Sequence, residues 1–485
     1  MMLTERMNCA ISLSGRMAGR CSSNASKPDN NSNKNEPKYV KKNLSSGGQG
    51  NRKQKTNSSS RSSRIRKSLM QEQVKFTTPV STDPHVAILG GGMSGLICAL
   101  TLEDRGIRST VFDTGIHGLG GRMATRQIDP NHLVFDHAAQ FFTVSDPKFK
   151  KLVDGWISKG VVTEWKGQIC KLCPGGQSTQ LPPAVRYIAT NGMRLLADSM
   201  LSQSRLVNVV RPCWISKMEP FNGMWHLTEN TKPQGAFDTI VIAHNGKCAN
   251  RLLASSGVPL LAKQMKRLEL SSIWALIAAF DEPLPVPKGL EGIPFEGAFV
   301  GGVDALSWMA NNTKKLFPSQ NHGPYCWTFF STAAYGKRNK VPQENIPNVK
   351  ADKVKQEMLQ GIEIALGLQE GSLQRPFYSR VQLWGAALPT NTPGIPCIFD
   401  SHGRAGICGD WLLGSSLEAA ALSGMSLAHQ IADYFSGVSG GSNPDDFSIG
   451  LHQEFTHINE HDIGQFPGTD ILQRQNSPAS EPAFV

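Results

Sequence analysis

A glycine-rich turn near residue 90 has the spacing that binds the phosphates of a dinucleotide. It follows a short apolar run and opens a stretch with helical periodicity. Gly90 permits the tight turn, Gly92 lets the backbone approach a pyrophosphate, and Gly95 allows a helix to pack closely on a strand. Free N–H groups at the start of that helix favour an anion. The residues predicted to hold the pyrophosphate are Gly90, Gly92, Met93, Ser94 and Gly95.

An acidic residue stands where a second nucleotide contact is expected. Asp113 ends the next apolar run, at the offset of about 20 residues that this chemistry requires. Its carboxylate is predicted to accept hydrogen bonds from the adenosine ribose, with Thr114 beside it. Together these residues predict the first β-α-β unit of a dinucleotide-binding fold.

A second glycine-rich loop favours a flavin over a simple nicotinamide cofactor. Gly120, Gly121, Arg122 and Met123 follow the second predicted strand directly, where simple NAD dehydrogenases have no such loop. The glycine pair suits close contact with the pyrophosphate or the flavin edge, and Arg122 would supply charge-assisted hydrogen bonds. Arg126 has two interpretations, as a functional residue of this loop or as a surface arginine. The predicted cofactor is FAD.

A block near residue 410 predicts a third contact with the cofactor. A strand is expected to end at Gly409, with Asp410 directly after it, and Ser415 and Glu418 have the spacing of a capping box. The helix that follows, from about 416 to 435, would direct its N-terminus and Leu417 at the isoalloxazine. Its dipole would stabilise negative charge that develops on flavin reduction.

These blocks carry a family resemblance. The paired glycine motifs resemble the flavoprotein superfamily of amine oxidases and carotenoid desaturases, and within it the sequence is similar to renalase and its bacterial and plant relatives. The likeness spans about residues 85–435. Its blocks are GGRMATR at 120–126, FDHAAQFFT at 135–143, FSTAAY at 330–335, LWGAALP at 383–389, GICGDW at 406–411 and LEAAALSG at 417–424.

The resemblance implies a fold and a reaction. The fold would be α/β, with a discontinuous Rossmann-like FAD-binding domain and an inserted α+β substrate domain, as in amine oxidases. The reaction would pass a hydride from a small-molecule substrate to flavin N5, with O2 as a further acceptor. Renalase-like enzymes oxidise misreduced nicotinamide dinucleotides, so NAD(P)H or a related dinucleotide is an implied partner. The cofactor contacts that the resemblance adds are Gln140, Ile215, Asp410 and Glu418.

The family resemblance identifies the substrate less well than it identifies the cofactor. The aromatic candidates for the substrate wall are Phe141, Trp327 and Trp384, each of which is also a plausible core residue. Related sequences carry Tyr where Phe141 stands and Arg where Gly385 stands, so a hydroxyl and a guanidinium are missing. No acid–base residue is identified.

The expected domains alternate along the chain. The FAD-binding domain is expected from 84–150, 190–255 and 400–436, and the substrate domain from 151–189 and 256–399. A basic leader at 1–83 and a polar tail at 437–485 complete the chain.

The net charge of +11 belongs to the leader. Residues 1–84 hold 16 Lys and Arg against 5 Asp and Glu, whereas the other 401 residues hold 34 of each. A neutral body gives no electrostatic reason to expect nucleic acid. The Ser- and Arg-rich leader is expected to be a transit peptide for plastids, with mitochondria as the alternative. The competing interpretation is a disordered basic tail that has no targeting role or that contacts RNA.

Other function classes have little support. No apolar run approaches the length of a membrane span. Cys170 and Cys173 form the only close cysteine pair, without the partners that zinc requires, so no metal is expected. Two alternatives stay open: an amine-oxidase or desaturase-type enzyme acting on an amine or apolar substrate, and a non-catalytic flavin-binding scaffold in an organellar complex.

Overall fold

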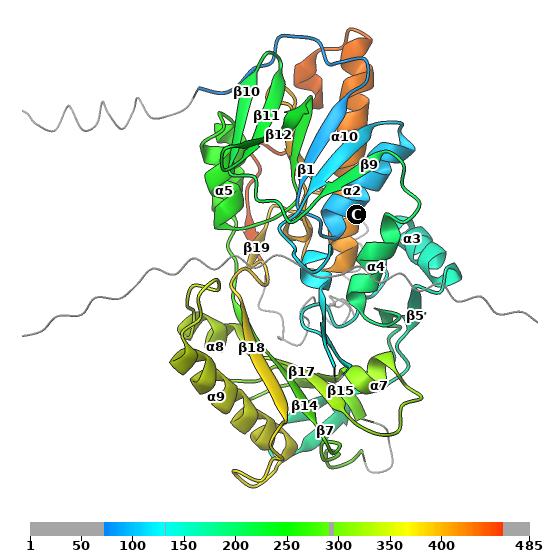
Figure 1. The fold of residues 1–485 in the computed structure, drawn as a ribbon, viewed down its shortest axis with the longest axis vertical. Helices are drawn as coiled ribbons and strands as arrows, with labels where there is room; N and C mark the ends of the chain where they lie inside the picture. The colour runs from blue at the N-terminus through cyan, green and yellow to red at the C-terminus, as the bar shows by residue number, and fades with distance from the viewer. Residues whose placement is uncertain (1–71, 131, 291–294, 459–485) are drawn as a thin grey trace, which may run out of the picture. The chain divides into compact units, whose positions relative to one another are not determined.

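The computed structural model describes residues 72–130, 132–290 and 295–458 (Figure 1). Most of the predicted leader and the final part of the predicted tail lie outside these ranges. Among the described residues, no helix combines the length and the apolar character needed to cross a membrane.

A six-stranded sheet forms the first layer of the fold. Its order is β20-β21-β13-β1-β2-β9, and all neighbouring strands are parallel except the edge pair β20 and β21. Val86 to Leu89 are buried, as expected for a parallel strand with both faces covered. The strands are β1 (His85–Leu89), β2 (Arg108–Phe112), β9 (Val207–Val210), β13 (Thr239–Ile242), β20 (Ile398–Asp400) and β21 (Ala405–Ile407).

Helices from both ends of the chain pack beside this sheet. Figure 1 shows α10 alongside α2, although the two are separated by more than 300 residues in the sequence. Gly424 permits this approach, because a Cβ there would lie 2.2 Å from the carbonyl oxygen of Ser94. The helices of this region are α2 (Met93–Asp104), α3 (Pro147–Ser158), α4 (Met193–Met200), α5 (Lys247–Ala254), α6 (Pro259–Arg267) and α10 (Leu417–Ser439).

A seven-stranded mixed sheet forms the second large layer, in the order β18-β14-β17-β16-β15-β6-β7. All eight residues of β14 are buried, and α9 packs against the core that they share (Figure 1). Its strands are β6 (Gln168–Cys173), β7 (Gln177–Gln180), β14 (Ile273–Phe280), β15 (Phe295–Val300), β16 (Trp308–Asn311), β17 (Tyr325–Phe330) and β18 (Tyr378–Trp384). Its helices are α7 (Asn312–Leu316), α8 (Ala333–Arg338) and α9 (Asn348–Leu366). The two sheets confirm the predicted α/β class and its Rossmann-like part.

Short strands make four smaller sheets: β3 (Thr125–Ile128) with β4 (Leu133–Asp136), β5 (Val162–Glu164) with β8 (Tyr187–Ala189), β19 (Asn391–Thr392) with β22 (Thr456–His457), and β10 (Lys217–Phe221), β11 (Met224–Glu229) and β12 (Lys232–Phe237). Three 3-10 turns complete the described elements: η1 (Gly121–Met123), η2 (Asp410–Leu412) and η3 (Pro444–Phe447).

One predicted strand is in fact two. The apolar run from Val207 to Met218 predicts a continuous strand, but β9 belongs to the six-stranded sheet and β10 to a separate one. Pro212 lies between them, and it lacks the N–H group that a continuing ladder needs. Ile215 therefore lies in a connection and not in a strand.

The ends of the described chain pack on its body, beyond the bounds of 84 and 436 expected for the FAD-binding domain. Phe76 lies against Trp225, with ring centroids 5.5 Å apart, and Gln73 donates a hydrogen bond to Asp400. At the other end β22 pairs with β19, and Phe455 stacks on Trp411. The ordered body therefore begins before His85 and continues past the last predicted helix.

Candidate cofactor site

A cavity of about 380 Å³ lies at the carboxyl ends of β1, β2, β13 and β21. This is the edge at which open α/β sheets bind their ligands. Both glycine motifs and the block near residue 410 line it together. The predicted site residues that line this cavity are Gly90, Gly92, Met93, Ser94, Asp113, Thr114, Gly120, Gly121, Arg122, Met123, Gly409, Asp410 and Leu417.

The first glycine motif leaves room for a ligand at one position and for none at the others. A Cβ on Gly95 would lie 2.0 Å from the carbonyl oxygen of Gly90, and a Cβ on Gly90 would lie 2.8 Å from that of Ala243. A Cβ on Gly92 would meet only the carbonyl oxygen of Gly120, at 4.0 Å. Gly92 thus faces open cavity at the N-terminus of α2, which fits the close approach of a pyrophosphate.

Asp113 holds the turn as well as facing the cavity. One carboxylate oxygen accepts a 2.7 Å hydrogen bond from the Gly91 amide, and the other accepts one of 2.7 Å from the Gly115 amide. Each carboxylate oxygen has a second lone pair, so ribose hydroxyls can still donate to this group. The same side chain can therefore shape the loop and bind a nucleotide.

Arg122 and Asp410 form a bidentate ion pair between the two predicted motifs. The guanidinium donates hydrogen bonds of 2.5 and 2.8 Å to the two carboxylate oxygens, and a further one of 3.0 Å to the carbonyl of Ala387. Asp410 is buried, whereas Arg122 is partly exposed toward the cavity. The pair brings a charge-assisted donor to the place where sequence reasoning expects the cofactor.

A second cavity of about 600 Å³ extends the first toward Ile215. The two share Gly90, Asp113 and Thr114 among their lining residues, so they adjoin, and the two together are called the channel. Its wall includes Ile215, the predicted adenine contact, and Arg251, which the sequence analysis did not single out.

The segment after β13 was also missed by the sequence analysis. His244 and Asn245 line both cavities. They follow β13 just as Asp113 follows β2, so their position after a buried apolar strand was the available signal. Burial lowers the pKa of His244, which keeps its imidazole neutral beside the channel.

The start of α10 corrects the predicted capping box. Ser416, not Ser415, is the N-cap, and its hydroxyl accepts a 3.0 Å hydrogen bond from the Ala419 amide. Glu418 turns away and accepts hydrogen bonds from Ser145 and Asp146 at the start of α3. Leu417 and Ser416 line the cavity, but Glu418 does not. The helix N-terminus still faces the cavity, without the predicted acid.

Gln140 also lies away from the described cavity walls. It is 1% exposed, and its side-chain amide donates to the carbonyls of Asp136 and Ala138. It therefore shapes the buried loop after β4, and any contact with a cofactor would come through that loop.

The aromatic candidates separate in the structure. Trp384 lines the cofactor cavity, its indole donates to the carbonyl of His137, and its ring stacks on the His137 imidazole. Phe141 packs between Trp165 and Trp308. Trp327 lies in the core of the seven-stranded sheet. Trp384 is therefore the candidate best placed to meet a substrate, and Trp327 acts in packing.

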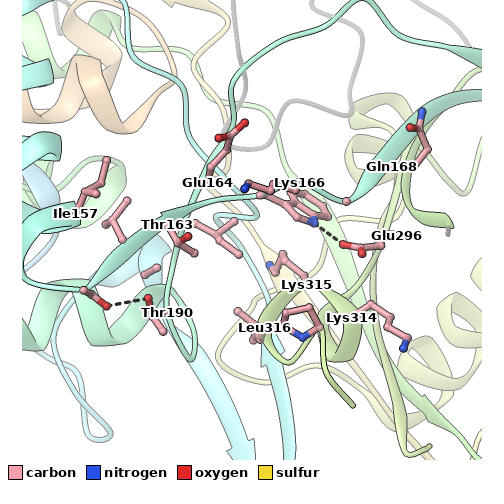
Figure 2. Close-up of a pocket in the computed structure, with 17 residues that line it drawn as sticks. Ile157, Thr163, Glu164, Lys166, Gln168, Thr190, Glu296, Lys314, Lys315 and Leu316 are labelled. Carbon is pink, nitrogen blue, oxygen red and sulfur yellow. Dashed lines mark hydrogen bonds between the residues drawn. The ribbon is translucent and has the colours of Figure 1, made fainter. Parts of the chain in front are cut away.

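A further cavity, of about 880 Å³, lies beside α3, β5 and α7 (Figure 2). The charged groups deepest in it already have protein partners. Glu296, labelled in Figure 2, accepts a hydrogen bond of 2.6 Å from the Trp165 indole. Lys315 forms an ion pair with Asp136. Lys314 donates to the carbonyl of Gln320. Each of these three groups is thus bound by another part of the protein, which leaves the cofactor cavity as the better candidate site.

Within the described ranges no group of three or more His, Cys, Asp or Glu side chains is arranged to hold a metal ion. Cys170 and Cys173 both lie in β6 as free thiols.

Comparison with known proteins agrees with this geometry. Residues 88–156 match the NAD(P)-binding Rossmann-like domain family. Over 133 residues the chain is 36% identical to protoporphyrinogen oxidase 2, chloroplastic/mitochondrial, of Arabidopsis thaliana. That match covers 26% of this chain and 24% of the relative, so it spans about a quarter of each.

Solved structures show the same fold over a larger part of the chain. A candidate protoporphyrinogen oxidase from Exiguobacterium sp. and cyclohexylamine oxidase from Brevibacterium oxydans each superpose with a TM-score of 0.53, at 13% identity. Each match covers 73% of this chain and 99% of the other. Putrescine oxidase gives a TM-score of 0.52 at 10% identity, covering 72% and 98%.

The dinucleotide-binding motif, the cavity beside it and the matching fold lead to one assignment. The chain carries a dinucleotide-binding domain of the NAD(P)-binding Rossmann-like type at residues 88–156, and its fold is similar to the folds of a candidate protoporphyrinogen oxidase, cyclohexylamine oxidase and putrescine oxidase.

Proposed function

We propose that this protein is an FAD-dependent oxidoreductase that oxidises a small-molecule substrate beside Trp384. The observation that carries the proposal is the channel, the pair of adjoining cavities at the carboxyl edge of the six-stranded sheet. The channel brings together every glycine motif that the sequence singles out and ends at an aromatic wall. Bound there, FAD supplies a two-electron acceptor that protein side chains lack.

Different residues of the channel would bind different parts of the cofactor. Gly92 and the amides at the start of α2 would receive the pyrophosphate, and Asp113 would accept from the adenosine ribose. Ile215 would cover the adenine end. The Arg122–Asp410 pair would lie near the flavin end, where Arg122 can donate to an anionic edge and Asp410 keeps it oriented.

For the substrate we propose a renalase-like role, the oxidation of misreduced nicotinamide dinucleotides with O2 as acceptor. The sequence blocks around 120–143 and 383–389 support it. Phe141 and Gly385 depart from those relatives. A hydroxyl is missing at the first position, and at the second the Gly385 amide donates to Gln343. Substrate recognition would therefore rest on other groups.

An amine-oxidase-type reaction on an amine or apolar substrate is the second candidate. An apolar cluster next to Trp384 favours this second candidate, because apolar surroundings suit such substrates. The cluster includes Phe141, Ile273, Trp308 and Phe330.

The test is an absorption spectrum of the purified full-length protein, followed by anaerobic mixing with NADH, NADPH, their misreduced isomers and a panel of amines. We expect flavin bands that bleach rapidly with a misreduced isomer. Bleaching by amines alone would replace the renalase-like role with the second candidate. Flavin that no reductant bleaches would indicate a non-catalytic flavin-binding scaffold, and the absence of flavin would refute the assignment of the channel.

We also propose import into plastids, with mitochondria as the alternative destination. The acid-poor basic leader and the organelle names of the Arabidopsis relative support this. Because residues 72–84 pack on the body, the targeting signal is expected within residues 1–71. A fluorescent reporter fused after residue 71 should enter plastids in plant cells; a reporter that stays in the cytosol would refute the proposal.

A further inference from the structure

Two arginines from different strands line a small cavity next to the cofactor cavity. Arg126 belongs to β3 and Arg380 to β18, and both line a cavity of about 290 Å³. Trp384 and Gln343 line this cavity and the cofactor cavity as well, so they form the wall between the two. We call this space the arginine cavity.

Neither guanidinium has a carboxylate partner among the residues that the structure describes. Arg126 donates only a long hydrogen bond of 3.4 Å to the side chain of Gln382. No Asp or Glu of the described ranges lies within 4.0 Å of the guanidinium nitrogens of Arg126 or Arg380. Glu344 lines the same cavity but remains exposed at its rim.

The two positive charges act on each other and on their surroundings. Burial and the charge of Arg380, which is itself exposed, lower the pKa of Arg126. Burial and the same two arginines lower the pKa of His137 to about 4, so its imidazole adds no positive charge near neutral pH. An anion placed between the guanidiniums would remove this repulsion.

The geometry suits an oxyanion better than a point charge. An arginine presents a planar fork of donors that matches a carboxylate or a phosphate, and two forks can bind more of its oxygens than one. Arg380 and Gln382 are two residues apart in a strand, so both side chains lie on one face of β18, toward the cavity that Arg126 enters. Gln382 can add a neutral donor.

We propose that the arginine cavity binds an anionic group of the substrate, a carboxylate or a phosphate, whose reacting part lies on the cofactor side of Trp384. This inference rests on the proposed function, because it takes the cofactor cavity as the place of reaction. It names the substrate class as anionic and makes Arg126 and Arg380 specificity-determining residues. It also disfavours cationic amines, which the two guanidiniums would repel.

The test is calorimetric titration of the full-length protein with phenyl phosphate, benzoate and benzylamine. Phenyl phosphate and benzoate distinguish the two anionic sources, and benzylamine reports a cation of similar shape. We expect at least one anion to bind, and Arg126→Gln and Arg380→Gln each to weaken it about tenfold or more. Arg126→Lys should retain part of the affinity, since it keeps the charge and loses the fork.

Arg375→Gln is the matched control, because this exposed arginine lies outside the arginine cavity. It should leave the affinity unchanged. Equal anion affinity in the wild type, Arg126→Gln and Arg380→Gln, or no binding of either anion at millimolar concentration, would overturn the inference.

Flavin content, read in the same samples from absorbance, separates this inference from the proposed function. If the protein contains flavin but both arginine variants bind the anion as the wild type does, the proposed function stands and the anion-binding role of the arginine cavity is refuted. If the protein contains no flavin but binds the anion through Arg126 and Arg380, the anion site stands and the proposed function is refuted.

Discussion

At the scale of single residues, the chemistry depends on side chains whose partners come from distant segments. Asp410 pairs with Arg122 across 288 positions of sequence, and Lys315 pairs with Asp136 across 179. The first pair lies at the cofactor cavity and the second is buried away from solvent. Substitutions at the two places should therefore affect different measurements, cofactor retention in the first case and folding stability in the second.

Gly92→Val should abolish flavin retention with little loss of stability. The added Cβ meets no close neighbour, so the branched side chain fills the space intended for the pyrophosphate. Flavin absorbance relative to protein absorbance, measured after purification, gives the result. Gly155→Val in α3, where a Cβ also meets nothing within 4 Å, is the control and should stay flavinated. A fully flavinated Gly92→Val protein would contradict the role of this turn.

Lys315→Met should reduce the free energy of unfolding by about 3–5 kcal/mol, because it leaves a buried carboxylate without its cation. The side chains of Lys315 and Asp136 are 0% and 1% exposed, and their charged atoms lie 2.8 Å apart. Urea unfolding measures the change. Lys150→Met, which breaks the exposed pair with Asp154, should cost less than about 1 kcal/mol. Similar costs for the two variants would show that burial does not strengthen the first pair.

His137 should make the protein less stable as the pH falls from about 6.5 toward 4. Its folded pKa of about 4 lies below the ordinary histidine pKa of 6.5, so between these values the unfolded chain binds the additional proton. The slope contributed by this residue is at most about 1.4 kcal/mol per pH unit. His137→Phe should remove that slope from urea unfolding series at pH 7, 6 and 5, whereas the exposed His322→Phe should retain it. An unchanged slope in His137→Phe would assign the acid sensitivity to other groups.

At the scale of elements, helix α10 lines the cofactor cavity with its first turn. The hydroxyl of Ser416 caps it, while that of Ser415 is buried without a hydrogen-bond partner among the described residues. Glu418 instead joins the start of α10 to the start of α3. The first turn thus fixes the helix N-terminus at the cavity and ties two helices together.

Ser416→Ala should lower the free energy of unfolding by about 1 kcal/mol, the usual cost of losing an N-cap hydroxyl. Ser415→Ala is the matched control, and it should be close to neutral because no hydrogen bond is lost. Urea unfolding of both variants distinguishes the observed cap from the one that the sequence spacing predicts. A larger loss in Ser415→Ala than in Ser416→Ala would restore the predicted capping box.

At the scale of the whole molecule, the site is assembled from segments spread over most of the chain. The cofactor channel joins loops near residues 90, 115, 215, 245 and 410. Residues 72–84 add a strap across the outer side of this body, where Phe76 lies between Trp225 and the guanidinium of Arg404. The strap connects the first described residues to β11 and β21, so it belongs to the folded unit.

Phe76→Ala should therefore reduce the free energy of unfolding by about 1–3 kcal/mol, less than for a fully buried aromatic because Phe76 is only half-buried. The exposed neighbour Thr77→Ala should leave stability within about 0.5 kcal/mol of wild type. Thermal unfolding of the full-length variants gives the comparison. A Phe76→Ala protein as stable as Thr77→Ala would show that the strap contributes no packing free energy.

The local parts of the cofactor site follow from the sequence alone. The spacing of Gly90, Gly92 and Gly95 specifies a turn through short-range sterics, and the apolar runs around it specify strands and helices through their periodicity. For this reason the α/β class, the position of α2 and most of the residues that line the cavity could be predicted without a structure.

Only the tertiary structure decided which side chains meet. Trp327 and Trp384 are equivalent as aromatic residues in strands, yet one packs in a core and the other lines the cavity. Arg126 reads equally well as a surface residue, and only the register of β18 places Arg380 near it. Such contacts depend on long-range packing between sheets, which no local pattern encodes, whereas the glycine turns depend on backbone sterics within a few residues.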